Sequence, residues 1–115
     1  MRILLDHCVP KRLKQYLIID HEVETAREAG WEALKNGKLL AQVATRFDVM
    51  LTVDQNIKHQ QNLSKLPMAV IVMVAPDNRL PTLVPYLSKV EQTLLTIHPN
   101  ELIEVFPPTQ PDSGE

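Results

Sequence analysis

The sequence predicts a single α/β domain of three layers, in which helices cover both faces of a mainly parallel sheet of about five strands. Two observations favour this Rossmann-like class. Short apolar runs alternate with segments of helical period about five times along the chain, which is typical of repeated β–α–β units. The run at 68–74 is apolar throughout, as expected for a central parallel strand that is covered on both faces.

Five segments have the character of strands. The first is a compact apolar run at 3–5, and the second is a weak alternation at 21–25. The third and fourth strands are expected at 48–52 and 68–74, and a short segment at 101–105 is expected to form an edge strand. Connections between parallel strands of one sheet are right-handed in nearly all cases, which leaves few topologies.

Three segments between these strands have helical spacing. The first begins near Pro10, a residue that is well placed at a helix start, and its apolar positions are Leu13, Tyr16 and Leu17. The second stripe covers 39–47, after a break at Asn36 and Gly37, and the third helix is expected over 81–97. These segments account for three of the four connections between the predicted strands.

Composition and length exclude several classes of protein. The chain has 115 residues, of which 44% are hydrophobic, and no run approaches the roughly 18 apolar residues of a membrane span. Its single cysteine, Cys8, cannot form an internal disulfide, which fits a reducing compartment. We therefore expect a cytoplasmic protein without a membrane partner. Residues 1–106 form the predicted domain, and 107–115 form a predicted disordered tail because they lack core-forming side chains.

The formal net charge of −2 conceals an asymmetry along the chain. Residues 1–65 carry ten Lys and Arg against eight Asp and Glu, whereas residues 66–115 carry two against six. The first part can therefore present a mildly basic face although the whole chain is acidic. An ordinary mixture of surface charges is the commoner cause of such a difference.

Polar residues follow the first and third predicted strands at the points where ligands bind in open α/β sheets. Asp6 follows the first strand, and Thr52 and Asp54 follow the third. If these strands are neighbours, Asp6 and Asp54 meet in one crevice. Two adjacent carboxylates repel each other unless Mg²⁺ or Mn²⁺ neutralises them, and such a cation can activate water for attack on phosphorus. An Asp after a strand is, however, also a common turn or helix-capping residue.

Other polar residues point less clearly to chemistry. Lys11 and Arg12 on the first helix, and Lys58 and His59 after Asp54, could contact phosphates, although solvated charges are commoner on helices. The four histidines lack the spacing of a zinc site, and His21 and His98 are expected at the surface. The three glycines form no phosphate-binding loop. Cys8 and its neighbour His7 point to opposite sides of an extended segment, which argues against a nucleophile pair.

Four segments resemble a short branch of the PIN-like domain family. They are Leu-Leu-Asp-His-Cys-Val-Pro at 4–10, the segment at 28–40 that contains Gly-Trp and Asn-Gly, Phe-Asp-Val-Met-Leu-Thr-Val-Asp-Gln-Asn-Ile at 47–57, and Gln-Gln-Asn-Leu at 60–63. Each motif alone is weak, but four in the right order are specific. The apolar strand at 68–74 and the helix at 81–97 continue the likeness, which covers nearly the whole chain except the tail.

The resemblance implies a compact PIN-like fold and an Mg²⁺- or Mn²⁺-dependent ribonuclease, of the kind that often serves as the toxin of a toxin–antitoxin pair. Asp6 matches the first acidic position of the family and Asp54 the last, and both are the expected metal ligands. Asn36 stands where related sequences often have Asp, and Thr52 is the polar companion of Asp54. Implied partners are RNA, a small antitoxin protein and a second copy of the chain.

The chain also departs from the family pattern. His7 and Lys38 stand where Glu is frequent, and Asn36 is at best a neutral oxygen ligand. Fewer carboxylates bind a hard cation more weakly. Lys38, if it points inward, could take the place of a metal charge or contact a phosphate. The alternative function is therefore a catalytically weakened PIN-like protein that binds RNA or a protein partner.

A third class of protein places Asp residues at similar points of a domain of this length. Phosphoacceptor receiver domains have Asp after the first and third strands, but they also need a Lys after the last strand. The last predicted strand is followed here by Phe106, Pro107 and Pro108, and no Lys follows Lys89. The sequence therefore disfavours a receiver domain.

Overall fold

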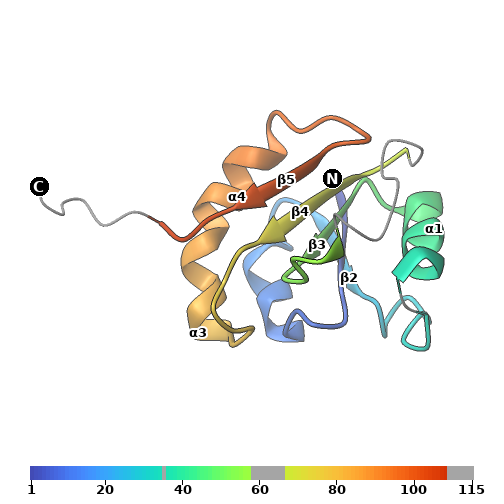
Figure 1. The fold of residues 1–115 in the computed structure, drawn as a ribbon, viewed down its shortest axis with the longest axis horizontal. Helices are drawn as coiled ribbons and strands as arrows, with labels where there is room; N and C mark the ends of the chain where they lie inside the picture. Colours follow the sequence, from blue (N-terminus) through green and yellow to red (C-terminus); the bar gives the residue numbers. More distant parts are fainter. Residues whose placement is uncertain (35, 58–66, 109–115) are drawn as a thin grey trace, which may run out of the picture.

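The computed structural model describes residues 1–34, 36–57 and 67–108, which form a five-stranded sheet between two layers of helices (Figure 1). The strands are β1 (Arg2–Leu5), β2 (Glu22–Thr25), β3 (Val49–Thr52), β4 (Ala69–Met73) and β5 (Leu102–Val105). The helices are the 3₁₀ helix η1 (Lys11–Tyr16), α1 (Asn36–Arg46), α3 (Leu80–Leu83), the 3₁₀ helix η3 (Val84–Tyr86) and α4 (Leu87–Leu94). The predicted three-layer α/β class is confirmed.

All neighbouring strands are parallel, and their order is β2-β1-β3-β4-β5. β1 and β3 lie side by side, with Leu5 of β1 in register with Leu51 of β3. The chain leaves β1 toward one edge of the sheet and later returns to its other side, so the strand order reverses between β1 and β3. In doubly wound sheets a crevice forms at this point, beyond the carboxyl ends of the two strands.

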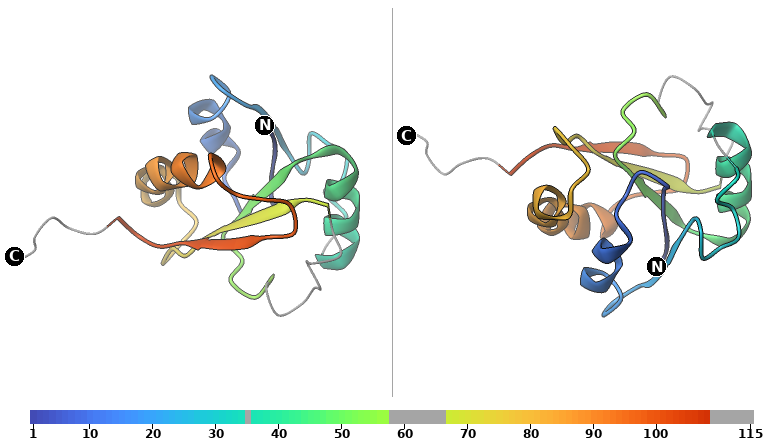
Figure 2. Two further views of the ribbon diagram at one scale, coloured as in Figure 1. Left: turned by 90° about the horizontal axis from the view of Figure 1, so that it is seen from above. Right: turned by 90° about the horizontal axis from the view of Figure 1, so that it is seen from below.

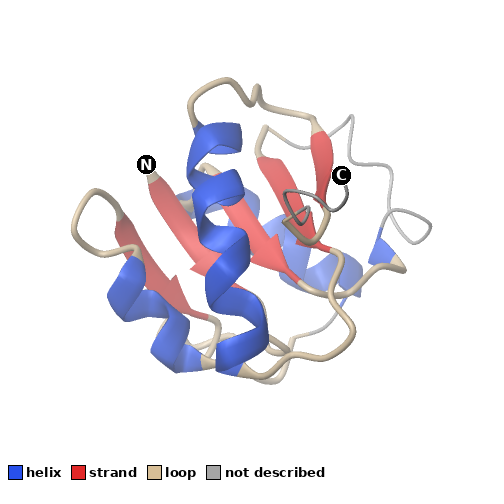
Figure 3. Ribbon diagram, turned by 90° about the vertical axis from the view of Figure 1, so that its left-hand side faces the viewer, coloured by secondary structure: helices blue, strands red, loops and turns tan. Residues whose placement is uncertain are grey.

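The sheet separates two apolar cores because successive residues of a strand point to opposite faces. Ile3 and Leu5 of β1 pack with the side chains of η1, α3, η3 and α4, whereas Leu4 packs with those of α1. Figure 3 shows η1 and the α3–α4 run in front of the sheet and α1 behind it. All residues of β3 and β4 are buried, which explains why neither strand alternates in sequence.

The connection from β4 to β5 has the opposite hand to those from β1 to β2 and from β2 to β3. The β2–β3 and β4–β5 connections cross the sheet in the same direction, but α1 covers one face and the α3–α4 run covers the other (Figure 2). Right-handed connections are expected in nearly all such sheets, so the presence of both hands in one sheet is a departure from that rule.

The first and last predicted helices also differ from expectation. The segment after Pro10 is a 3₁₀ helix, in which Leu13 and Leu17 are buried but Tyr16 is 45% exposed. The predicted helix at 81–97 is divided into α3, η3 and α4. Pro85 lies inside the 3₁₀ turn η3 and has no N–H to continue an α-helical hydrogen-bond ladder, which explains the division.

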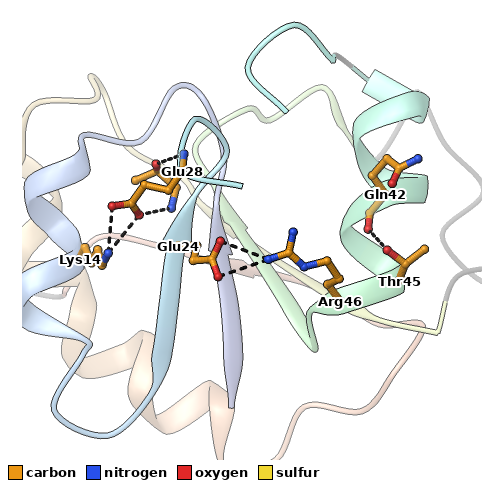
Figure 4. Close-up of polar contacts among 7 residues, drawn as sticks. Lys14, Glu24, Glu28, Gln42, Thr45 and Arg46 are labelled. Atoms are coloured by element: carbon orange, nitrogen blue, oxygen red, sulfur yellow. Dashed lines mark hydrogen bonds and ion pairs between the residues drawn. The ribbon is translucent and has the colours of Figure 1, made fainter. Parts of the chain in front are cut away.

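Ion pairs connect the outer layers to the sheet and to each other. Arg46 at the end of α1 lies 3.3 Å from Glu24 of β2, and Lys14 of η1 lies 3.0 Å from Glu28 (Figure 4). On the face that η1 and α4 share, His21 Nε2 lies 2.8 Å from Glu91 Oε1 of α4, and the His21 side chain is only 11% exposed. The expectation that His21 is a surface residue is therefore wrong, because this pairing encloses its ring.

Candidate functional site

Asp6 and Asp54 lie at the carboxyl end of the sheet, where its strand order reverses. Asp6 is the first residue after β1, and its backbone N–H donates to Leu51 O of β3 over 3.0 Å. Asp54 is the second residue after β3. Both side chains line one cavity, so the predicted convergence of these two residues occurs.

Thr52 connects the two acidic residues through one hydroxyl group. Its side chain is fully buried at the last position of β3, the only buried polar residue among those that the structure describes. Thr52 Oγ1 donates to Asp6 Oδ2 over 2.8 Å and accepts the backbone N–H of Asp54 over 3.0 Å. The hydroxyl therefore fixes the orientation of the Asp6 carboxylate and the backbone of the turn that carries Asp54.

Backbone groups hold one oxygen of each carboxylate. Asp6 Oδ1 accepts the N–H of His7 over 2.7 Å, and Asp54 Oδ1 accepts the N–H of Asn56 over 2.9 Å. Both contacts are local turns of the kind that Asp commonly forms after a strand. Each carboxylate oxygen has two lone pairs, so capacity remains on both residues for an external ligand.

Cys8 lies beside Thr52 and Asp6, but its thiol is not activated as a nucleophile. Its Sγ is 3.4 Å from Thr52 Oγ1 and 3.8 Å from Asp6 Oδ2. Burial raises the pKa of the Cys8 thiol, and the nearby Asp6 charge raises it further, against the lowering effect of the hydrogen bond to Thr52. The thiol is therefore protonated at neutral pH, whereas a nucleophilic cysteine reacts as the thiolate.

His7 and Asn78 anchor neighbouring loops to the segment after β1. His7 Nε2 lies 2.8 Å from the carbonyl oxygen of Leu34, which can only accept, so Nε2 carries a proton and donates it. Asn78 Nδ2 donates to the carbonyl oxygen of Cys8 over 2.8 Å. The loop before α1 and the loop after β4 are thereby both attached to the segment that carries Asp6.

The cavity beside the two carboxylates has a volume of about 620 Å³. Its polar part contains Asp6, His7, Cys8, Glu32 and Asp54. Its apolar part is formed by Leu39 and Leu40 of α1, Met50 of β3, and Val53 and Ile57 after β3. This volume lies within the range of about 300–1,000 Å³ that is usual for ligand sites.

The cationic residues predicted to bind substrate do not gather at the cavity as Asp6 and Asp54 do. Lys11 and Arg12 are exposed at the start of η1, where they form no ion pair with any residue in the described ranges. Lys38 is exposed on α1 and is not among the residues that line the cavity, so the structure does not support its inward orientation. Lys58 and His59 lie outside the described residues.

The predicted third site residue, Asn36, is the first residue of α1, but its side chain lies outside what the structure describes. In the described parts of the chain, no three Asp, Glu, His or Cys side chains are placed to hold a metal ion together. Asp6 and Asp54 are two hard oxygen ligands on one cavity, whose lining also includes the carboxylate of Glu32. Mg²⁺ is commonly held by one or two carboxylates, with water and substrate phosphates completing its shell, so this pair fits a minimal Mg²⁺ or Mn²⁺ site.

Several features of the site are not evident from the sequence. The sequence does not indicate the double hydrogen bond of Thr52, the anchoring contacts of His7 and Asn78, or the apolar side chains beside the cavity. Asn78 does follow a predicted strand, which is a usable signal for a residue at this edge of the sheet. The remaining features depend on which strands are neighbours and on which face α1 covers.

Comparisons with protein-family models, with curated proteins and with solved structures found no match to this chain. In the residues that the structure describes, no helix has the length and apolar character needed to cross a membrane.

Proposed function

We propose that this chain is a PIN-like metal-dependent phosphodiesterase that cleaves RNA. The observation that carries the proposal is the placement of Asp6 and Asp54 on one cavity at the β1–β3 crevice, with the Thr52 hydroxyl bonded to both residues. The motifs at 4–10, 28–40, 47–57 and 60–63 supply the family resemblance, and through it the expectation that the substrate is RNA.

Asp6 and Asp54 would hold a bound Mg²⁺ or Mn²⁺, with Asn36 as a further oxygen ligand. When bound, the cation supplies a nucleophilic water and neutralises charge on the scissile phosphate. Thr52 holds the Asp6 carboxylate in one orientation, so that its free lone pairs face the cavity. Lys11 and Arg12 attract the anionic backbone from the η1 side of the crevice, and Lys58 and His59 follow Asp54 in sequence as further candidates for phosphate contacts.

The test is cleavage of a mixed RNA population by the purified protein. We expect cleavage with Mn²⁺, none with a chelator, and a loss on the order of a hundredfold in Asp54→Asn, which replaces a charged oxygen ligand by a neutral one. Asp77→Asn is the matched control, because Asp77 follows β4 at the same sheet edge but does not line the cavity. Equal cleavage by all preparations would identify a contaminating nuclease and overturn the proposal.

A toxin role is a further part of this proposal, supported by the family resemblance. It predicts that induced expression slows the growth of a bacterial host and that Asp6→Ala abolishes this effect. It also predicts a small antitoxin that binds the protein, in addition to a homodimer. Growth arrest that persists in Asp6→Ala would contradict a toxicity based on cleavage.

The second candidate is a non-catalytic PIN-like module that binds RNA or a protein. It is favoured by the carboxylate set, which contains only two members among the described residues, and by the neutral Asn36. Titration calorimetry with millimolar Mn²⁺ separates the two functions. Heat of binding that disappears in Asp6→Ala supports the enzyme, and no binding by the wild type supports the module.

A receiver domain has the same strand order as this chain and is the third class to consider. Such domains use a Lys at the carboxyl end of the last strand. Here β5 is followed by Phe106, Pro107 and Pro108, and no Lys follows Lys89 in the sequence. We therefore do not propose phosphoacceptor activity.

A further inference from the structure

We propose that Arg79, in front of α3, joins Lys11 and Arg12 of η1 in a basic strip that binds the RNA strand on one side of the scissile phosphate. The inference rests on the proposed phosphodiesterase function. It adds to that function one residue, Arg79, and the direction in which the strand leaves the acidic pair.

The first observation is that two helices begin side by side at the carboxyl end of the sheet. η1 follows β1 and α3 follows β4, and these two helices are in contact (Figure 2). The loops in front of them are joined, because Asn78 Nδ2 donates to the carbonyl oxygen of Cys8 over 2.8 Å. Lys11 comes three residues after Cys8, and Arg79 directly follows Asn78. The members of the basic strip therefore lie on either side of one junction.

The second observation is that hydrogen bonds fix the turn that carries Arg79. Asp77 Oδ1 accepts the backbone N–H of Arg79 over 2.9 Å. Where the chain leaves β4, the hydroxyl of Tyr86 donates to the carbonyl oxygen of Val74 over 2.7 Å. The junction between the two loops then connects this turn to the segment that carries Asp6. The backbone of Arg79 is thus held in a defined position relative to the acidic pair.

The third observation is that the cations of the basic strip have little compensation inside the protein. Lys11 and Arg12 are exposed and form no ion pair with any described residue. The Arg79 side chain is 77% exposed, and its ion pair with Asp77 spans 3.6 Å within one turn. Neither η1 nor α3 has an acidic residue in its first turn. An ion pair this exposed contributes little, so all three cationic groups are available to an external anion.

The fourth observation is that the basic strip lies on one side of the acidic pair. Its residues belong to the layer of η1 and α3, whereas the loop before α1 brings the carboxylate of Glu32 to the cavity. A phosphate backbone is attracted by the strip and repelled by Glu32, so the strand passes over η1 and the start of α3. Contacts with phosphates carry no sequence information, so the strip positions the strand without selecting bases.

The first test measures binding of a short fluorescent single-stranded RNA, with a chelator present so that the RNA is not cleaved. We expect Arg79→Gln to weaken binding about fivefold at low salt and to reduce the slope of log Kd against log salt by about 0.7, the share of one phosphate contact. The loss should be equal for RNAs of different sequence. Arg79→Lys keeps the charge and should keep the wild-type slope.

Arg27→Gln is the matched control. Arg27 is 84% exposed and lies 3.5 Å from Glu32, so it resembles Arg79 and its pair with Asp77 in both exposure and pairing. Each variant removes one cation and leaves one carboxylate unpaired, but Arg27 lies outside the basic strip. We expect Arg27→Gln to bind RNA like the wild type. Equal weakening by the two variants would show that the RNA responds only to net charge, and would overturn the inference.

Cleavage of an RNA with one mapped site tests the direction of the strand. Arg79→Gln should raise KM and leave kcat unchanged, because Arg79 does not line the cavity. The RNA is then shortened from each end in turn, up to the nucleotide next to the scissile phosphate. The difference between Arg79→Gln and the wild type should disappear for one shortened RNA and persist for the other. If both shortened RNAs keep the difference, or both lose it, the one-sided path is wrong.

The outcomes separate this inference from the proposed function. If the wild type cleaves RNA with dependence on Mn²⁺ and Asp54, and Arg79→Gln binds and cleaves equally well, the basic strip is wrong and the phosphodiesterase stands. If RNA is bound through Arg79 but is not cleaved, the phosphodiesterase falls and the strip belongs to the non-catalytic module. If the wild type binds no RNA at low salt, the strip is wrong.

Discussion

Thr52 shows how one buried hydroxyl determines the geometry of the candidate site. It donates to Asp6 Oδ2 and accepts from Asp54 N, and the surrounding core excludes water from it. Thr52→Val keeps the shape of the side chain but leaves the Asp54 N–H without its partner. We expect a loss of about 1–3 kcal/mol in the free energy of unfolding, because an unsatisfied buried group retains its full desolvation cost. Urea denaturation measures this change.

Thr52→Ser is the matched control, because it keeps the hydroxyl and removes one methyl group. We expect it to retain both hydrogen bonds and to lose about 1 kcal/mol through the small cavity that it leaves. If Thr52→Val is as stable as Thr52→Ser, the double hydrogen bond contributes nothing, and the role of Thr52 in holding the acidic pair is wrong.

Cys8 provides a chemical probe of the same group. Its thiol has a raised pKa, chiefly through burial, and it is the one cysteine of the chain, so alkylation reports a single site. We expect iodoacetamide to label native Cys8 more slowly than the urea-unfolded chain at neutral pH, with the native rate rising only at more alkaline pH. Mass spectrometry of samples quenched over time measures both rates.

The raised pKa of Cys8 also fixes the sign of a stability effect. The folded protein keeps its thiol proton at a pH where the unfolded chain has lost it. The contribution is therefore complete below the unfolded thiol pKa of about 8.5 and is lost as pH rises through the folded pKa. Native labelling as fast as that of the unfolded chain would show that the thiol is neither shielded nor raised in pKa.

At the residue scale, the sequence was sufficient to predict that Asp6 and Asp54 lie at one edge of the sheet, because each closely follows an apolar strand. The neighbouring positions of β1 and β3 then bring them to one cavity. The double hydrogen bond of Thr52 could not be predicted, since Asp6 lies 46 residues from Thr52 in the sequence and Asp54 lies two residues from it. Only the strand order determines that the first of these contacts exists.

At the scale of the elements, Gly30 controls the connection between β2 and α1. It has a φ of 84°, and the turn around it is closed by the N–H of Trp31 donating to Ala26 O over 2.9 Å. A Cβ atom at Gly30 would meet nothing within 4 Å, so a substitution there changes the backbone preference without a clash. We expect Gly30→Ala to lower the free energy of unfolding by about 1–2 kcal/mol, the cost of a left-handed L-residue. Chemical denaturation measures this loss.

Gly30→Asn is the control for this backbone effect, since Asn tolerates the left-handed region better than Ala. Its loss should be clearly smaller than that of Gly30→Ala. Equal losses in the two variants would indicate that the glycine is needed for another reason. A Gly30→Ala variant as stable as the wild type would show that this turn adopts a negative φ.

The elements also show where sequence patterns stop being informative. Strands β3 and β4 were predictable because an unbroken apolar run of this length in a short domain rarely forms anything except a buried strand. The division of the last helix is explained by Pro85, which interrupts an apolar stripe that continues on both sides of it. No local sequence pattern predicts the hand of the β4–β5 connection. The apolar stripe of α4 is compatible with either face of the sheet, and packing against η1 decides between them.

At the scale of the whole molecule, the proposed metal site predicts that metal binding is linked to folding. A cation that binds the folded chain at Asp6 and Asp54, and the unfolded chain hardly at all, stabilises the protein in proportion to the logarithm of its concentration. For a two-carboxylate site with a Kd of about 1 mM, Mn²⁺ at about 10 mM adds about 1.4 kcal/mol. For a domain of this size we expect Tm to rise by about 5 °C.

Matched variants distinguish this site from general screening of charge. Asp54→Asn should lose the rise in Tm and should itself be slightly more stable without metal, because removing one of two nearby carboxylates relieves repulsion. Asp77→Asn should keep the full rise, since Asp77 does not line the cavity. NaCl at equal ionic strength should give no comparable shift, because screening does not require the acidic pair. If Mn²⁺ raises Tm equally in the wild type and in Asp54→Asn, the cation binds elsewhere and the acidic pair is a structural feature of the sheet edge.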